Sequence, residues 1–120
     1  MQVPQDQIYT PTYNLDLAAA TLSLVKRGAS GTYHLCGPER MDRVELARSV
    51  ASYFGLDTSL INGVPTSVIE QKAKRPLSAG LSINKLRRLH PDLNMRTVAE
   101  GLKDSRGNLE AFLRSCARLA

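Results

Sequence analysis

A single strong strand candidate lies between two helical segments, and this arrangement limits the folds open to the chain. Residues 31–36, GTYHLC, are short and β-prone, and Gly37-Pro38 follows them. The pattern predicts one buried strand. Such a strand needs neighbours on its edges, and the chain offers few other strand candidates. We therefore expect an α/β fold whose sheet is completed by strands from outside these residues.

A helix is predicted on each side of this strand. The first extends from Asn14, a suitable N-terminal cap, to Gly28, a suitable C-terminal cap. The second begins at Asp42, which has a capping-box spacing to Glu45, and ends at Gly55. The apolar residues of the first helix that fall roughly on one face are Leu15, Leu17, Ala18, Leu22 and Val25.

The remaining segments carry weaker patterns and indicate a mostly helical chain with few short strands. Residues 1–13 are rich in Gln, Pro and Thr and predict a loop with at most a short extended piece. The weaker elements are a strand fragment at 7–9, a short strand at 61–64, a helix at 83–90 between Ser82 and Pro91, and a last helical stretch from about Arg96 to Leu119 with a candidate break near Gly107.

Length and composition restrict the class of protein. The 120 residues suffice for one domain, and no apolar run approaches the roughly 20 residues that cross a bilayer. No charged-then-apolar leader opens the sequence, so a cytoplasmic location is expected. Cys36 and Cys116 form no CxxC pair, which favours free thiols in a reducing compartment over a disulfide or metal site.

The net charge of +5 is concentrated late in the chain. From Lys72 onward there are eleven Lys and Arg against four Asp and Glu. Such a surface attracts the phosphates of a nucleotide or a nucleic acid, although solvated helix faces explain most of these residues. A nucleic-acid-binding domain is the least favoured function, because no aromatic stacking residues lie among its basic candidates. Those candidates are Lys85, Arg87, Arg88 and Arg96.

The motifs of a complete active site are missing from the sequence. There is no GxGxxG fingerprint, no P-loop and no carboxylate cluster with metal-ligand spacing. Neither Tyr13 nor Tyr53 has a Lys four residues later, so no Tyr-Lys pair for proton transfer can be assigned. We therefore predict no catalytic, cofactor-binding or metal-binding residue in this chain.

Three segments, spread over nearly the whole chain, carry a recognisable pattern. Its residues are Asp6-Gln7 with Pro11-Thr12 and Asp16-Leu17-Ala18; Gly31 to Leu35 with Gly37, Asp42 and Glu45-Leu46-Ala47; and Val64 to Ser67 with Arg75-Pro76, Leu81 and Lys85. These segments resemble the C-terminal part of an extended short-chain dehydrogenase/reductase of the dTDP-4-dehydrorhamnose reductase group, and also the regulatory beta subunit of methionine adenosyltransferase. Tyr9 departs from the reductase pattern, which often has glycine there.

The resemblance implies the C-terminal lobe of a Rossmann-type reductase, with the dinucleotide-binding half outside the chain. Residues 1–120 would form the sugar-nucleotide-binding domain, and the intact protein would use NADPH or NADH to reduce a dTDP-linked 4-keto deoxysugar. Gln7 and Thr12 would lie near the substrate, and Arg75 would face its diphosphate. A non-catalytic regulatory subunit and a sugar-nucleotide epimerase or dehydratase are the alternatives.

The chemistry of Arg75 fits this role on physical grounds. A guanidinium can make two parallel charge-assisted hydrogen bonds to phosphate oxygens, and Pro76 would hold Arg75 extended. The alternative for Arg75 is an ion pair with a surface carboxylate. Gln7 and Thr12 could equally fix loops by hydrogen bonds, and Asp16 could simply complement the positive end of its helix.

The chain alone is expected to be inactive, because the cofactor loop and the Tyr-Lys pair are missing. NADPH oxidation measured with the keto-sugar nucleotide and residues 1–120 should stay at background, and turnover above background would contradict this. If strand partners are also missing, residues 31–36 expose two edges. The isolated chain should then be marginally stable or self-associate, whereas a monomer with a cooperative high-temperature melt would argue against exposed edges.

Overall fold

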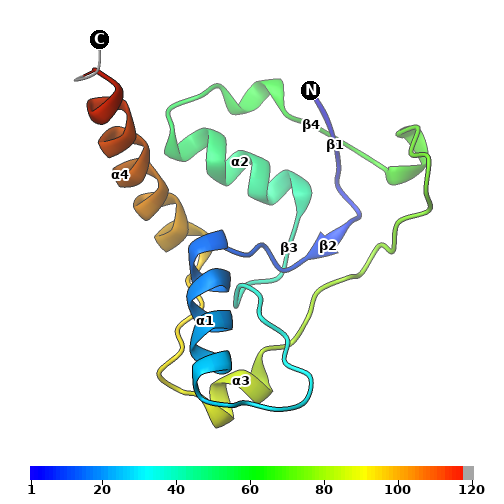
Figure 1. Cartoon of the computed structure of the whole chain (residues 1–120). Coiled ribbons are helices and arrows are strands. Elements are labelled where there is room, and N and C mark those ends of the chain that lie inside the picture. The colour runs from blue at the N-terminus through cyan, green and yellow to red at the C-terminus, as the bar shows by residue number, and fades with distance from the viewer. Residues whose placement is uncertain (118–120) are drawn as a thin grey trace.

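The computed structural model describes residues 1–117, with side-chain environments given through residue 108. It is a mixed α/β fold, mostly helical with few short strands, as expected (Figure 1). The four longer elements in the chain are helices, and the strands have two or three residues each. The elements are β1 Gln2–Pro4, β2 Ile8–Tyr9, α1 Asn14–Lys26, β3 Met41–Asp42, α2 Arg43–Tyr53, η1 Thr58–Leu60, β4 Asn62–Val64, η2 Thr66–Val68, α3 Asn84–Leu89 and α4 Val98–Ala117.

The strands form two separate pairs. β1 and β4 are parallel, with Val3 opposite Gly63, and β2 and β3 are antiparallel, with Ile8 opposite Asp42. The predicted short strand at 61–64 and the fragment at 7–9 correspond to β4 and β2. β1 and β3 were not predicted from the sequence, because strands of two or three residues are too short to show a period-2 pattern.

The strand predicted at residues 31–36 is wrong, since no strand is formed there. Its physical requirement, a neighbouring strand, is not met by the described part of the chain. Side chains fix the segment instead: the Cys36 thiol is buried and faces the Leu81 carbonyl oxygen at 3.7 Å, and Lys85 Nζ lies 4.1 Å from the Tyr33 ring centre. Self-association through a strand edge here stays a prediction.

Helix α1 buries a different face from the one predicted. Asp16, Ala20 and Leu24, spaced by one helical turn, point into the fold. The predicted apolar face is exposed: Leu22 is 61% and Val25 72% accessible. The side chain of Asn14 does not cap the helix, whereas Gly28 closes it in the left-handed region with a φ of 63°, as predicted.

Two hydrophobic clusters hold the elements together, one at each end of the molecule (Figure 1). The first joins α1 and α3 with the segments around Cys36 and Met95, and Leu86 is its most buried member. The second joins α2 to the β1–β4 pair. The members of the first are Ala20, Leu24, Cys36, Ile83, Leu86 and Met95; those of the second are Val3, Val44, Ala51 and Ile61.

Capping boxes set the starts of the two helices that pack against each other, α2 and α4. Asp42 accepts hydrogen bonds from the amides of Val44 and Glu45, and the Glu45 carboxylate accepts one from the Asp42 amide, as predicted. Thr97 and Glu100 form the same arrangement before α4. Helix α4 continues through Gly107 without the predicted break. No helix in residues 1–117 combines the length and apolarity needed to span a membrane.

Gly37 marks a close approach between two backbone segments. A Cβ atom there would lie 1.9 Å from the Pro11 carbonyl oxygen, far inside van der Waals contact. The Gly37 amide also donates to Thr12 Oγ1 at 3.2 Å. The loop of residues 10–12 can therefore sit against residues 36–38 only if position 37 has no side chain.

Substituting Gly37→Ala should lower the free energy of unfolding by about 1–3 kcal/mol or more, because the backbones must separate. The control is Gly107→Ala in α4, where an added Cβ has nothing within 4 Å. This control should raise stability by up to about 1 kcal/mol through helix propensity. Thermal melts followed by circular dichroism test both, and equal melting temperatures for Gly37→Ala and the unchanged chain would refute the steric explanation.

Candidate functional site

The residues that follow β1 and β4 lie at one edge, because the two strands are parallel. Asp6 follows β1 and accepts hydrogen bonds from both the amide (3.0 Å) and the hydroxyl (2.5 Å) of Thr66, which follows β4. The hydrogen bond from the Thr66 hydroxyl lowers the pKa of Asp6 below its usual value, so the carboxylate is ionised at neutral pH. Asp6 thereby fixes the start of the loop that carries Arg75.

Gln7 is buried at this edge, with 4% of its surface accessible. Its side-chain Nε2 donates to Thr66 Oγ1 at 3.1 Å and, over a longer distance of 3.4 Å, to Gln71 Oε1. Its Oε1 accepts a hydrogen bond from Arg43 Nε at 2.9 Å. Gln7 therefore makes loop-fixing hydrogen bonds, one of the two roles that the sequence left open.

Gln7 and Arg75 line the same hollow of about 470 Å³, which we call the cationic hollow. It carries three cations and no carboxylate among its lining side chains. Arg75 is exposed and makes no hydrogen bond or ion pair with other residues in the described range, so the surface ion pair considered from the sequence is not formed. The lining residues are Gln2, Pro4, Gln7, Arg43, Ile69, Gln71, Lys72, Ala73 and Arg75.

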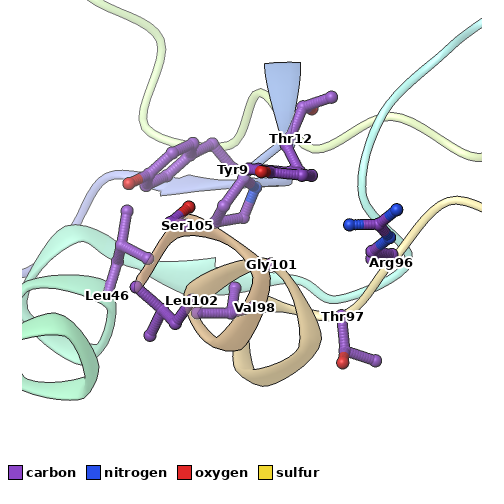
Figure 2. A pocket seen from close by; sticks show the side chains of 11 residues that line it. Tyr9, Thr12, Leu46, Arg96, Thr97, Val98, Gly101, Leu102 and Ser105 are labelled. Atoms are coloured by element: carbon purple, nitrogen blue, oxygen red, sulfur yellow. The ribbon is translucent and has the colours of Figure 1, made fainter. Parts of the chain in front are cut away.

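Thr12 lies at a different hollow, of about 320 Å³, between the loop after β2 and helix α4 (Figure 2). Tyr9 and Thr12 lie above the first turns of α4, which present Val98, Gly101 and Leu102. The Thr12 hydroxyl donates to the Thr10 carbonyl oxygen at 3.2 Å and accepts from the Gly37 amide. The fold therefore brings Gln7 and Arg75 together but places Thr12 apart from them.

Arg43 is the site residue that sequence reasoning missed. It lines the cationic hollow from the first turn of α2, and its guanidinium lies 4.9 Å from the centre of the Tyr9 ring. A cation in the first turn opposes the helix dipole, and this unfavourable placement was the available signal. Burial raises the pKa of Tyr9, which keeps its phenol neutral at physiological pH.

Two of the four cations considered for nucleic-acid binding are engaged within the fold. Arg96 pairs with Asp16 at 3.2 Å and with Asp104 at 2.8 Å, and Asp104 raises its pKa. Lys85 donates to the Thr32 carbonyl oxygen at 2.8 Å. These contacts explain Arg96 and Lys85 as structural residues and weaken the case for a basic nucleic-acid surface.

The described residues do not fit a dinucleotide or a metal ion. The parallel strands β1 and β4 are followed by Gln5 and Pro65 rather than by a glycine turn that opens a helix onto a pyrophosphate. Among the side chains described through residue 108, no group of three or more His, Cys, Asp or Glu could hold a metal.

Comparisons with known proteins identify the family of this chain. The sequence model of the RmlD substrate binding domain matches residues 1–109. A dTDP-4-keto-6-deoxy-D-glucose reductase of Streptomyces niveus is 33% identical over 76 residues, which are 63% of this chain and 26% of that protein.

Solved structures of two dTDP-4-dehydrorhamnose reductases are also similar. The Bacillus anthracis enzyme, solved in complex with NADP, matches with a TM-score of 0.76 and 30% identity, over 87% of this chain and 36% of that one. An ortholog from Clostridium acetobutylicum matches with a TM-score of 0.79 and 25% identity, over 92% of this chain and 39% of that one. The chain thus spans well under half of each relative, and it belongs to the family of RmlD substrate-binding domains.

Proposed function

We propose that residues 1–120 form the sugar-nucleotide-binding domain of an NAD(P)H-dependent reductase that acts on a dTDP-linked 4-keto deoxysugar. The cationic hollow carries this proposal, because Arg75 has no partner among the described residues and lines the hollow together with Arg43 and Lys72. A nucleoside diphosphate supplies the negative charge and the planar arrays of oxygens that guanidinium groups bind best. The related reductases are named for dTDP-linked sugar substrates, and these names suggest the substrate class.

The roles assigned to this chain are binding and orientation of the substrate. Gln7 would hold the loop of residues 66–75 over the diphosphate, and Arg75 would bind its oxygens. The family's cofactor is a dinucleotide hydride donor, NADPH or NADH, and the residues described here do not fit it, so we assign it no contact in this chain. Thr12, at the separate hollow, would contact the sugar only if the substrate reaches past Tyr9.

Arg75→Ala should weaken dTDP binding to the chain about tenfold, because a hydrogen bond to a charged group contributes about 1.5 kcal/mol or more. Isothermal titration calorimetry with dTDP measures this. Arg88→Ala, which removes an exposed cation from the last turn of α3, is the matched control and should bind like the unchanged chain. Absence of dTDP binding by the unchanged chain, or equal affinities for both variants, would overturn the proposal.

A further inference from the structure

Arg43 is held at two points, which is unusual for an exposed arginine. Its Nε donates to Gln7 Oε1 at 2.9 Å, and its guanidinium carbon lies over the Tyr9 ring, 4.9 Å from the ring centre. The hydrogen bond at Nε and the ring contact together restrict the position of the guanidinium. The two terminal Nη groups have no hydrogen-bond or ion-pair partner among the side chains described through residue 108.

The hydrogen bonds that hold Arg43 form a chain in which each donor points toward the Asp6 carboxylate, from Arg43 through Gln7 and Thr66 to Asp6. Asp6, ionised, can only accept, so the Thr66 hydroxyl gives its single hydrogen to Asp6. Toward Gln7, Thr66 is then an acceptor, and Gln7 must present its NH₂ group to it. The Gln7 carbonyl oxygen is therefore left facing Arg43 Nε, which can only donate. The ionised Asp6 therefore fixes the orientation of the Thr66 hydroxyl, and Thr66 in turn fixes the orientation of the Gln7 amide.

Among the described side chains, no carboxylate forms an ion pair with Arg43. Asp42, the N-cap of α2, and Glu45 in its first turn accept the backbone amides of the capping box instead. The remaining charged residues of the cationic hollow, Lys72 and Arg75, are also positive. Like charges around one hollow repel each other, and an anion bound between them relieves that repulsion.

We propose that Arg43 is a second diphosphate-binding residue, acting with Arg75, and that Tyr9 is the positioning residue that orients it. This inference rests on the proposed function and adds to it a second cation that lines the hollow with Arg75. Arg43 comes from a rigid helix and is held by Gln7 and Tyr9, whereas Arg75 comes from a loop. The fixed cation would set the position of the diphosphate, and the loop cation would then close on it.

The test compares Arg43→Ala with Arg48→Ala in calorimetric titrations with dTDP and with thymidine. Arg48 is the matched control, an exposed arginine on the same helix that lines a separate hollow with Glu39 and Glu45. Arg43→Ala should weaken dTDP binding about tenfold and leave thymidine binding unchanged, since thymidine has no phosphate. Arg48→Ala should change neither, and ¹⁵N correlation spectra check that both variants keep the fold.

The outcomes separate this inference from the proposed function. Unchanged dTDP affinity of Arg43→Ala, together with weakened binding by Arg75→Ala, would overturn the role of Arg43 and leave the proposed function standing. Equal losses for dTDP and thymidine would also overturn it, because they would indicate general damage to the site. A chain that binds no dTDP at all would remove the proposed function and this inference with it.

The role of Tyr9 is tested through Arg43. Tyr9→Phe keeps the ring and should bind dTDP like the unchanged chain, whereas Tyr9→Leu removes the π face and should weaken binding several-fold. In an Arg43→Ala background, Tyr9→Leu should cost nothing further, because the residue it positions is gone. An equal loss from Tyr9→Leu in both backgrounds would show that Tyr9 does not act through Arg43.

Discussion

The arrangement of this fold depends on one buried carboxylate. Asp16 is 6% exposed on the inner face of α1, and it accepts a hydrogen bond from the Arg96 amide at 2.7 Å and pairs with the Arg96 guanidinium. An uncompensated buried charge costs several kcal/mol, so α1 must keep Arg96 beside it. Since Arg96 immediately precedes the capping box of α4, this contact decides where α4 starts and how it reaches α2. The Asp16 charge is therefore more than a complement to the helix dipole.

The sequence predicted correctly those local features that depend on residues close together in the chain. The Asp42–Glu45 capping box, the Gly28 cap and the short strand at β4 all follow from residues a few positions apart. Two predictions that required a covering or pairing element were wrong. The strand at 31–36 has no neighbouring strand among the described residues, and the apolar face of α1 is not covered by them. The β-prone segment and the apolar face of α1 both have the pattern of buried surfaces. The two reductases of known structure are longer, since this chain covers 36% and 39% of them.

The candidate site could be predicted only in part for a related reason. Family resemblance pointed to Gln7 and Arg75, and the fold places both at one hollow. The parallel pairing of β1 and β4 determines the residues that surround Gln7 and Arg75. No local sequence pattern predicts this pairing. Arg43 enters the site through its bond to Gln7, 36 positions away, and its only local signal is an unfavourable place at a helix start.

The parallel β1–β4 pair also determines when the site can exist. Asp6 and Thr66 lie 60 positions apart, and the loop that their pairing closes contains both α1 and α2. Closing so long a loop carries an entropy cost that only the completed contacts repay. During synthesis, residues 2–7 must therefore wait for β4 and for the loop up to Arg75 before they find their partners. The edge that carries Asp6 and Gln7 is completed late in folding, although these residues leave the ribosome well before β4.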